Sequence, residues 1–273
     1  MQVDRPIFVV SMPRSGSTAL HRVMAAHPDL ATTSHASRRS PTWAPGIRFF
    51  RAVYYRRDAL SEGGRIWDRF QKHGHDVMEA QDVTPAARRF FRRTVETHLR
   101  LFRRERFLAR CPRLALRVNY FREIFPEAKF IHLVRDGRAV CRSVMRVWET
   151  SRRRTDRWDV KPPGWEQHIG DGPIGAAAFQ WRELVNYAET QGKAMGPGRF
   201  LTVTYESLVK EPDAVLGRIG AFCGLDCPHP AQREQIDGLG SRNYKWREAF
   251  TGEQVQTLNE LLGPAMERFG YRS

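Results

Sequence analysis

The sequence predicts an α/β protein in which helices flank a doubly wound parallel β-sheet. Short runs of apolar, β-favouring residues alternate with longer stretches of helical spacing, which is typical of parallel sheets. The run Lys129–Arg135 is mostly apolar and therefore fits a strand that is buried on both faces. The run Ile7–Ser11 leads through a turn rich in serine directly into a helical stretch. In such sheets ligands bind beyond the carboxyl ends of the strands.

The elements follow in chain order from apolar spacing and from start and stop signals. Thr84 is a plausible N-cap with Pro85 at the first helical position, and Thr251 forms a capping box with Gln254. Strands are expected at Ile7–Ser11, Ala31–Ser34, Phe107–Arg110, Lys129–Arg135 and Arg199–Tyr205. Helices are expected at Ser17–Ala26, Pro85–Arg104, Leu114–Phe125, Arg138–Trp148 and Ile174–Gln191, and after Thr251.

Length and composition suit a single domain over residues 1–273. The chain has 41% hydrophobic residues, and none of its apolar runs approaches the length of a membrane helix. The only apolar stretch near the N-terminus is the short Ile7–Val10 run, which does not fit a signal peptide, so a cytoplasmic protein is expected. Cys223, Cys227 and His229 lie close together without a second ligand pair, and no metal site is predicted.

The charge is strongly basic, with 45 Lys and Arg against 30 Asp and Glu and a formal net charge of +15. Such a charge attracts anionic ligands, and it keeps a nucleic-acid-binding protein open as an alternative. The basic residues are spread along the whole chain, and they form no zinc finger, basic heptad region or aromatic RNA-binding signature. An anionic small molecule is therefore the preferred ligand.

The segment "VSMPRSGSTALHR" is a P-loop-like sequence without the lysine of nucleotide hydrolases. Backbone amides of residues 14–18, aimed outward at the start of a helix, would form an anion cradle. Arg14 adds a planar charged fork, Gly16 permits close approach of the backbone, and Ser17 occupies the lysine position. Without that lysine, a kinase-like nucleotide enzyme is disfavoured.

A second anion site is predicted in "KFIHLVRDGRAVCRSV". Arg135 ends the buried strand, Asp136 and Gly137 form a tight turn, and Ser143 follows two turns along the next helix. An arginine and a serine placed in this way can converge on one phosphate.

With these two motifs the chain resembles the sulfotransferases that use 3′-phosphoadenosine 5′-phosphosulfate (PAPS), especially their tyrosylprotein and carbohydrate branches. The stretches "AHPDL", "VTYESLVKEP" and "KWREAF" also look like this family. The resemblance implies the sulfotransferase fold, PAPS as donor, adenosine 3′,5′-bisphosphate (PAP) as product, and no required metal. The regions around 37–80 and 150–173 match nothing in the family and are expected to build the acceptor site.

The resemblance also assigns roles to residues of the donor site. The 5′-phosphosulfate would lie on Arg14, Ser15, Gly16, Ser17 and Thr18, and the 3′-phosphate on Arg135 and Ser143. Tyr205 would lie near the adenosine, and Lys245 or Arg247 would close over the phosphates. These ten residues are the expected donor site.

The residues of the chemical step are less well defined by the sequence. The position of the glutamate base of the tyrosylprotein branch corresponds to His35, and Glu79 is the alternative base. Arg110 stands where relatives have a lysine that contacts the leaving oxygen; arginine can stabilise negative charge but cannot donate a proton at neutral pH. The expected acceptor is a hydroxyl of a carbohydrate or glycolipid, with a protein tyrosine or a small phenolic or natural product as alternatives. A homodimer is a further expectation, and specific nucleic-acid binding is not expected.

Overall fold

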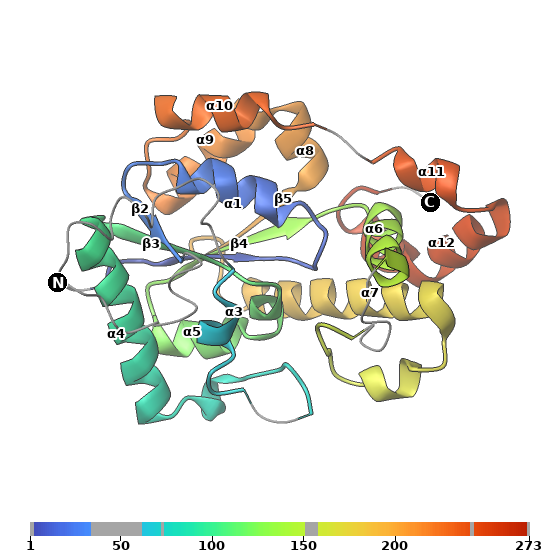
Figure 1. Ribbon diagram of the computed structural model, residues 1–273, viewed down its shortest axis with the longest axis horizontal. Coiled ribbons are helices and arrows are strands. Elements are labelled where there is room, and N and C mark those ends of the chain that lie inside the picture. Colours follow the sequence, from blue (N-terminus) through green and yellow to red (C-terminus); the bar gives the residue numbers. More distant parts are fainter. Residues whose placement is uncertain (1–2, 34–61, 72–73, 151–157, 241–242, 272–273) are drawn as a thin grey trace.

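Five parallel strands form one sheet with the order β2-β3-β1-β4-β5 (Figure 1). The computed structural model describes residues 3–33, 62–71, 74–150, 158–240 and 243–271. The strands are β1 (Ile7–Val10), β2 (Leu30–Thr32), β3 (Arg106–Arg110), β4 (Lys129–Val134) and β5 (Phe200–Thr204). Each lies within one or two residues of a predicted strand, which confirms the predicted fold class.

The direction of the chain reverses at the centre of the sheet. The chain leaves β1 toward β2 at one edge, whereas it leaves β4 toward β5 at the other edge. Because β1 and β4 are neighbours, the chain turns in opposite directions after them, and this pair marks the switch point of the sheet. This is the point where a doubly wound sheet binds its ligand.

Helices cover both faces of the sheet, with α1, α8, α9 and α10 on one face and α4, α5 and α7 on the other (Figure 1). The α-helices are α1 (Ser17–Ala25), α3 (Gly64–Trp67), α4 (Pro85–Phe102), α5 (Val118–Ile124), α6 (Gly137–Thr150), α7 (Gly172–Lys193), α8 (Tyr205–Lys210), α9 (Pro212–Cys223), α10 (Arg233–Asp237), α11 (Lys245–Ala249) and α12 (Gly252–Glu267). Short 3₁₀ helices are η3 (Ala80–Asp82), η4 (Pro112–Leu116), η5 (Trp165–His168) and η6 (Pro230–Gln232). The predicted N-cap at Thr84 and the capping box of Thr251 with Gln254 are both present.

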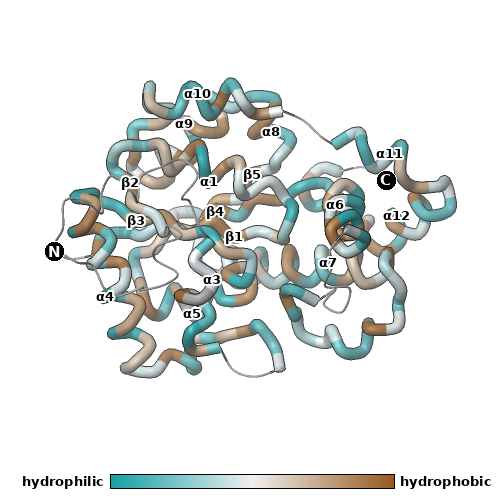
Figure 2. Tube along the Cα trace, in the orientation of Figure 1, coloured by the Kyte–Doolittle hydropathy of each residue, from teal (hydrophilic) through white to brown (hydrophobic). Residues whose placement is uncertain are grey.

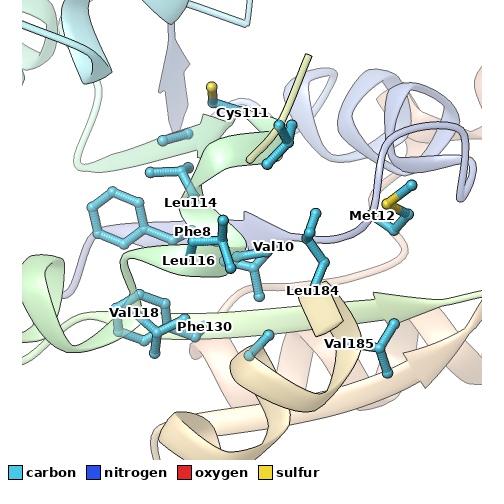
Figure 3. Packing of buried hydrophobic residues seen from close by; sticks show 14 of the residues in the cluster. Phe8, Val10, Met12, Cys111, Leu114, Leu116, Val118, Phe130, Leu184 and Val185 are labelled. Carbon is cyan, nitrogen blue, oxygen red and sulfur yellow. The ribbon is translucent and has the colours of Figure 1, made fainter. Parts of the chain in front are cut away.

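The central strand divides the core between the two faces of the sheet. Phe8 and Val10 point into the cluster shared with α5 and α7 (Figure 3). Ile7 and Val9 belong to the other cluster, under α1 and α9. The hydropathy of the chain agrees with this, since the strands at the centre are apolar and the outer helices carry hydrophilic residues (Figure 2). Alternating side chains of a strand buried on both faces explain why β1 is a continuous apolar run.

The stretch 114–125 differs from its prediction, because it is not one helix. The 3₁₀ helix η4 ends and α5 begins at Arg117, whose φ of −138° and ψ of 23° break the helical path. The side chain of Arg117 is fully buried and donates to the carbonyl oxygens of Asp76 and Trp67 and to the carboxylate of Asp68. The break therefore lies at the residue whose Nε and Nη1 bind these buried partners, which the helical spacing of the sequence does not indicate.

The C-terminal part of the chain contains helices that were not predicted. Among the described residues α8, α9, α10 and α11 lie between β5 and α12, where the sequence was not assigned to helices. Among all the residues that the structure describes, every helix is too short or too polar to cross a bilayer.

Candidate functional site

The loop between β1 and α1 has the backbone of an anion cradle. Arg14 and Gly16 both adopt left-handed conformations, with φ of 71° and 91°. Left-handed residues before a helix turn successive amides into one concavity, and the first amides of α1 have no acceptor within the helix. The prediction that every amide of residues 14–18 faces outward is wrong for Ser15, whose N–H donates to the carbonyl oxygen of Met12 at 3.2 Å.

Hydroxyl groups line the same loop. Ser15 is 1% exposed, and its Oγ has no hydrogen-bond partner within the described residues. Ser17 is buried, and Thr18 is exposed on the first turn of α1. A buried hydroxyl without a partner costs free energy unless a ligand completes its hydrogen bonds, so the loop fits an oxyanion.

Arg135 and Ser143, the residues of the second predicted anion site, both contact Arg14 of this loop. Arg135 lies directly after β4, and its Nη1 donates to the carbonyl oxygen of Arg14 at 3.2 Å. Ser143 lies on α6, and its Oγ accepts from Nε of Arg14 at 3.2 Å. The two predicted anion sites are therefore adjacent, because both residues of the second site contact Arg14 of the first.

Tyr205 joins the loop to Arg135. Its ring lies against Gly16, and the guanidinium of Arg135 stacks over it with 4.4 Å between Cζ and the ring centroid. The hydroxyl of Tyr205 donates to the carbonyl oxygen of Gly240 at 2.8 Å, which fixes the ring. Burial lowers the pKa of Arg135, while the nearby Tyr205 and Glu206 act in the opposite direction. Arg135 remains a cation at neutral pH.

Arg110 lies on the other side of the loop, at the carboxyl end of β3. Its side chain is 7% exposed; Nη1 donates to Oγ1 of Thr18 at 2.8 Å, and Nη2 pairs with the carboxylate of Glu62. His21 of α1 is fully buried nearby and shares a hydrogen bond of 2.8 Å with Oγ1 of Thr32. Burial, together with the charge of Arg110, lowers the pKa of His21 to about 3, so this histidine is neutral at physiological pH.

Comparison with known proteins identifies the family of the chain. A model of the "Sulfotransferase family" matches residues 6–229. The chain belongs to the sulfotransferase family. It is 24% identical, over 98% of its own length and 76% of the relative, to omega-hydroxy-beta-dihydromenaquinone-9 sulfotransferase Stf3 of Mycobacterium bovis.

Solved structures share the fold. The crystal structure of sulfotransferase STF9 from Mycobacterium avium matches 98% of this sulfotransferase and 77% of its own chain, with a TM-score of 0.66 and 15% identity. The mouse sulfotransferase SULT7A1, crystallised with PAP, matches 97% of this chain and 85% of its own, with a TM-score of 0.50 and 16% identity. The protein is therefore an enzyme, a sulfotransferase with the α/β fold of its family.

Lys245 and Arg247 lie on α11, outside the β1–α1 loop. Both are exposed on α11, which packs against α6. The guanidinium of Arg247 lies 4.7 Å from the ring centroid of Trp246. Lys245 follows Asn243 by two residues, and Asn243 itself contacts Arg135.

Of the two predicted bases, the structure describes only Glu79. His35 lies outside the described residues. Glu79 lies between α5 and α7, where its carboxylate accepts from Asn119, Gln191 and Tyr187. These contacts join Glu79 to the helical layer, and its hydrogen-bond partners within the described residues do not include residues 14–18.

Three side chains of the site were missed by sequence reasoning. Glu62 pairs with Arg110, and Asn243 and Glu206 form a hydrogen-bonded path to Arg135. Glu206 directly follows the predicted Tyr205 inside the stretch "VTYESLVKEP", whereas Asn243 lies two residues before the predicted Lys245 and outside the stretch "KWREAF". No spacing in the sequence connects Glu62 to Arg110.

Proposed function

We propose that this sulfotransferase transfers the sulfuryl group of PAPS to a hydroxyl group of a carbohydrate or glycolipid, with PAP as the product and without a metal. The observation that carries the proposal is the convergence of the β1–α1 loop, Arg135 and Ser143 on Arg14. Two adjacent anion sites match a donor with two anionic ends, the 5′-phosphosulfate and the 3′-phosphate. The PAP complex of the mouse relative supports the same donor.

When bound, the donor supplies an electrophilic sulfur; the acceptor oxygen forms a bond to sulfur as the bond to the bridging oxygen breaks. The residues of this chain must hold both anionic ends, remove the hydroxyl proton and stabilise charge on the leaving oxygen. Arg110, next to Thr18 at the mouth of the loop, is proposed to stabilise that charge. His35 is proposed as the base that takes the proton, and the contacts of Glu79 favour a structural role for that carboxylate instead.

The proposed acceptor is an alcohol rather than a phenol. The name of the mycobacterial relative describes a hydroxyl on a lipid chain, which supports a lipid-linked acceptor for this chain as well. An aromatic cluster of Trp158 and Phe179, with Trp148 and Trp165 packed against it, lies partly in the segment expected to build the acceptor site. Aromatic surfaces pack against the apolar faces of sugars and lipids alike. Protein tyrosine and small phenols remain the alternative acceptors.

Two measurements test the proposal in sequence. Isothermal titration should show binding of PAP and no comparable binding of ATP with magnesium, because Ser17 replaces the lysine that contacts the β- and γ-phosphates. Incubation with ³⁵S-labelled PAPS and separate pools of glycolipids, oligosaccharides, tyrosine peptides and phenols should then label the glycolipid or oligosaccharide pool. Preferred binding of ATP with magnesium would overturn the donor, and labelling of the phenols or peptides alone would overturn the acceptor.

A further inference from the structure

A hydrogen-bonded path connects Arg135 to residues that the donor-site motifs do not include. Nε of Arg135 donates to Oδ1 of Asn243 at 2.8 Å. Nδ2 of Asn243 donates to Oε1 of Glu206, which also accepts from the backbone amide of Asp136 at 3.2 Å. The other carboxylate oxygen of Glu206 accepts from the hydroxyl of Tyr271 near the C-terminus.

The orientation of the Asn243 amide is dictated by its two neighbours. A guanidinium only donates hydrogen bonds and a carboxylate only accepts them. The oxygen of Asn243 must therefore face Arg135, and its nitrogen must face Glu206. A reversed amide would place donor against donor and acceptor against acceptor.

The remaining surroundings of Arg135 leave one nitrogen for a ligand. Nη1 donates to the carbonyl oxygen of Arg14, and the flat face of the guanidinium lies on Tyr205. Within the described parts of the chain, Nη2 has no hydrogen-bond partner. With Nε held by Asn243, the guanidinium cannot rotate in its plane, so the direction of Nη2 is fixed.

The interposed amide also preserves the charge of Arg135. A direct ion pair with Glu206 would offset the positive charge that a phosphate needs, whereas a neutral amide orients the guanidinium without neutralising it. Glu206 instead forms its contacts with Asn243, Asp136 and Tyr271.

We propose that Asn243 is a positioning residue that aims Arg135 at the 3′-phosphate and thereby sets the preference of the enzyme for 3′-phosphorylated adenine nucleotides. The inference rests on the proposed function, because it assumes that Arg135 binds the 3′-phosphate of PAPS. Asn243 holds Arg135 from the C-terminal part of the chain, which Tyr271 anchors to the same carboxylate.

Titration calorimetry with two ligands tests the proposal. PAP carries the 3′-phosphate, whereas adenosine 5′-monophosphate (AMP) lacks it. Asn243→Ala should weaken PAP binding about 10-fold and leave AMP binding within about 2-fold of the wild type, because only the 3′-phosphate contact depends on the aim of Arg135. Asn243→Leu keeps the volume of the side chain, and it should show the same selective loss if the alanine variant does not fold.

Asn259→Ala is the matched control. Asn259 also accepts from an arginine, Arg138 at 3.1 Å, but that arginine pairs with Asp136 and was not assigned to the donor site. This variant should keep the wild-type ratio of PAP to AMP affinity. An equal loss for both ligands in the Asn243 variants, or an unchanged ratio, would overturn the positioning role. A wild-type protein that binds PAP no better than AMP would instead overturn the assignment of the 3′-phosphate site.

Discussion

The ring of Tyr205 lies directly against Gly16, so that a β-carbon built on Gly16 would lie 2.4 Å from Cδ2 of Tyr205. No side chain fits this distance without displacement of the ring, and the φ of 91° at Gly16 is strained for every residue except glycine. The contact ties the conformation of the loop to the residue that stacks on Arg135.

Gly16→Val should abolish donor binding more completely than Ser17→Ala. We expect a loss of PAP affinity of more than about 100-fold for the valine variant, because the strained backbone and the displaced ring both deform the cradle. Ser17→Ala removes one hydroxyl among several donors and should cost about 10-fold or less. Titration calorimetry measures both, with thermal melts to confirm folding. Equal PAP affinity in the two variants would show that the loop backbone does not form the cradle.

Arg135→Ala should weaken PAP binding by about 2–4 kcal/mol, because it removes a charge-assisted contact to a partly desolvated phosphate. Arg233→Ala is the control, since Arg233 forms an exposed ion pair with Asp213 on the surface of the molecule. The dissociation constants of both variants are measured by calorimetry at constant salt. An unaltered constant in a folded Arg135 variant contradicts the 3′-phosphate site.

Variants of Arg110 distinguish electrostatic stabilisation of the leaving oxygen from proton donation to it. If Arg110 stabilises the leaving oxygen as proposed, Arg110→Ala should lower kcat by about 10²–10³-fold, because it removes that positive charge. Arg110→Lys should retain more activity and add an alkaline limb to the pH–rate profile, because lysine loses its proton where arginine does not. Rate profiles from pH 6 to 10 measure this limb. A wild-type profile that already matches the lysine variant would argue against the electrostatic role of Arg110.

The strands and the donor loop could be predicted because their signals are local. Each strand is a short apolar run with nearby turn residues. Each predicted anion site lies at one junction between a strand and the helix that follows it, β1–α1 or β4–α6. The contacts of Arg135 and Ser143 with Arg14 agree with this topology, since the segments that carry them follow the neighbouring parallel strands β1 and β4.

The remaining features depend on contacts between distant parts of the chain. The break at Arg117 is caused by partners around residues 67–76, and helical spacing carries no information about them. Asn243 and Arg135 are 108 residues apart, and Glu62 and Arg110 are 48 apart. Tertiary packing brings such pairs together, so local patterns in the sequence of one chain do not reveal them.

The assignment of the base is tested by His35→Ala and Glu79→Gln. If His35 takes the proton, His35→Ala should lower kcat by about 10²–10⁴-fold, leave PAP affinity nearly unchanged and remove the acidic limb of the pH–rate profile. Glu79→Gln should lower the melting temperature instead, because the new amide nitrogen would face either the donor of Asn119 or that of Gln191, which bind different carboxylate oxygens. An acidic limb that survives in the His35 variant and disappears in the Glu79 variant would assign the base to Glu79.

Acid should destabilise the fold through His132, which lies in β4 between the rings of Phe200 and Phe269. Neither ring nitrogen of His132 has a hydrogen-bond partner within the described residues, and burial lowers its pKa to about 4, with Glu189 acting in the opposite direction. The unfolded chain binds a proton at this histidine below about pH 6.5, whereas the folded chain does so only near pH 4.

Between these two pH values the unfolded state therefore holds more protons, and stability falls as the pH falls, by up to about 1.4 kcal/mol per pH unit for one such group. His132→Phe should reduce this slope by the contribution of one proton, up to about 1.4 kcal/mol per pH unit. His21, with a pKa of about 3, should still contribute to the slope in the variant. Urea unfolding of both proteins at pH 7, 6 and 5 measures the slopes, with His75→Ala, at an exposed position, as the control. An unchanged slope in the folded phenylalanine variant would show that His132 is not the buried group that titrates on unfolding.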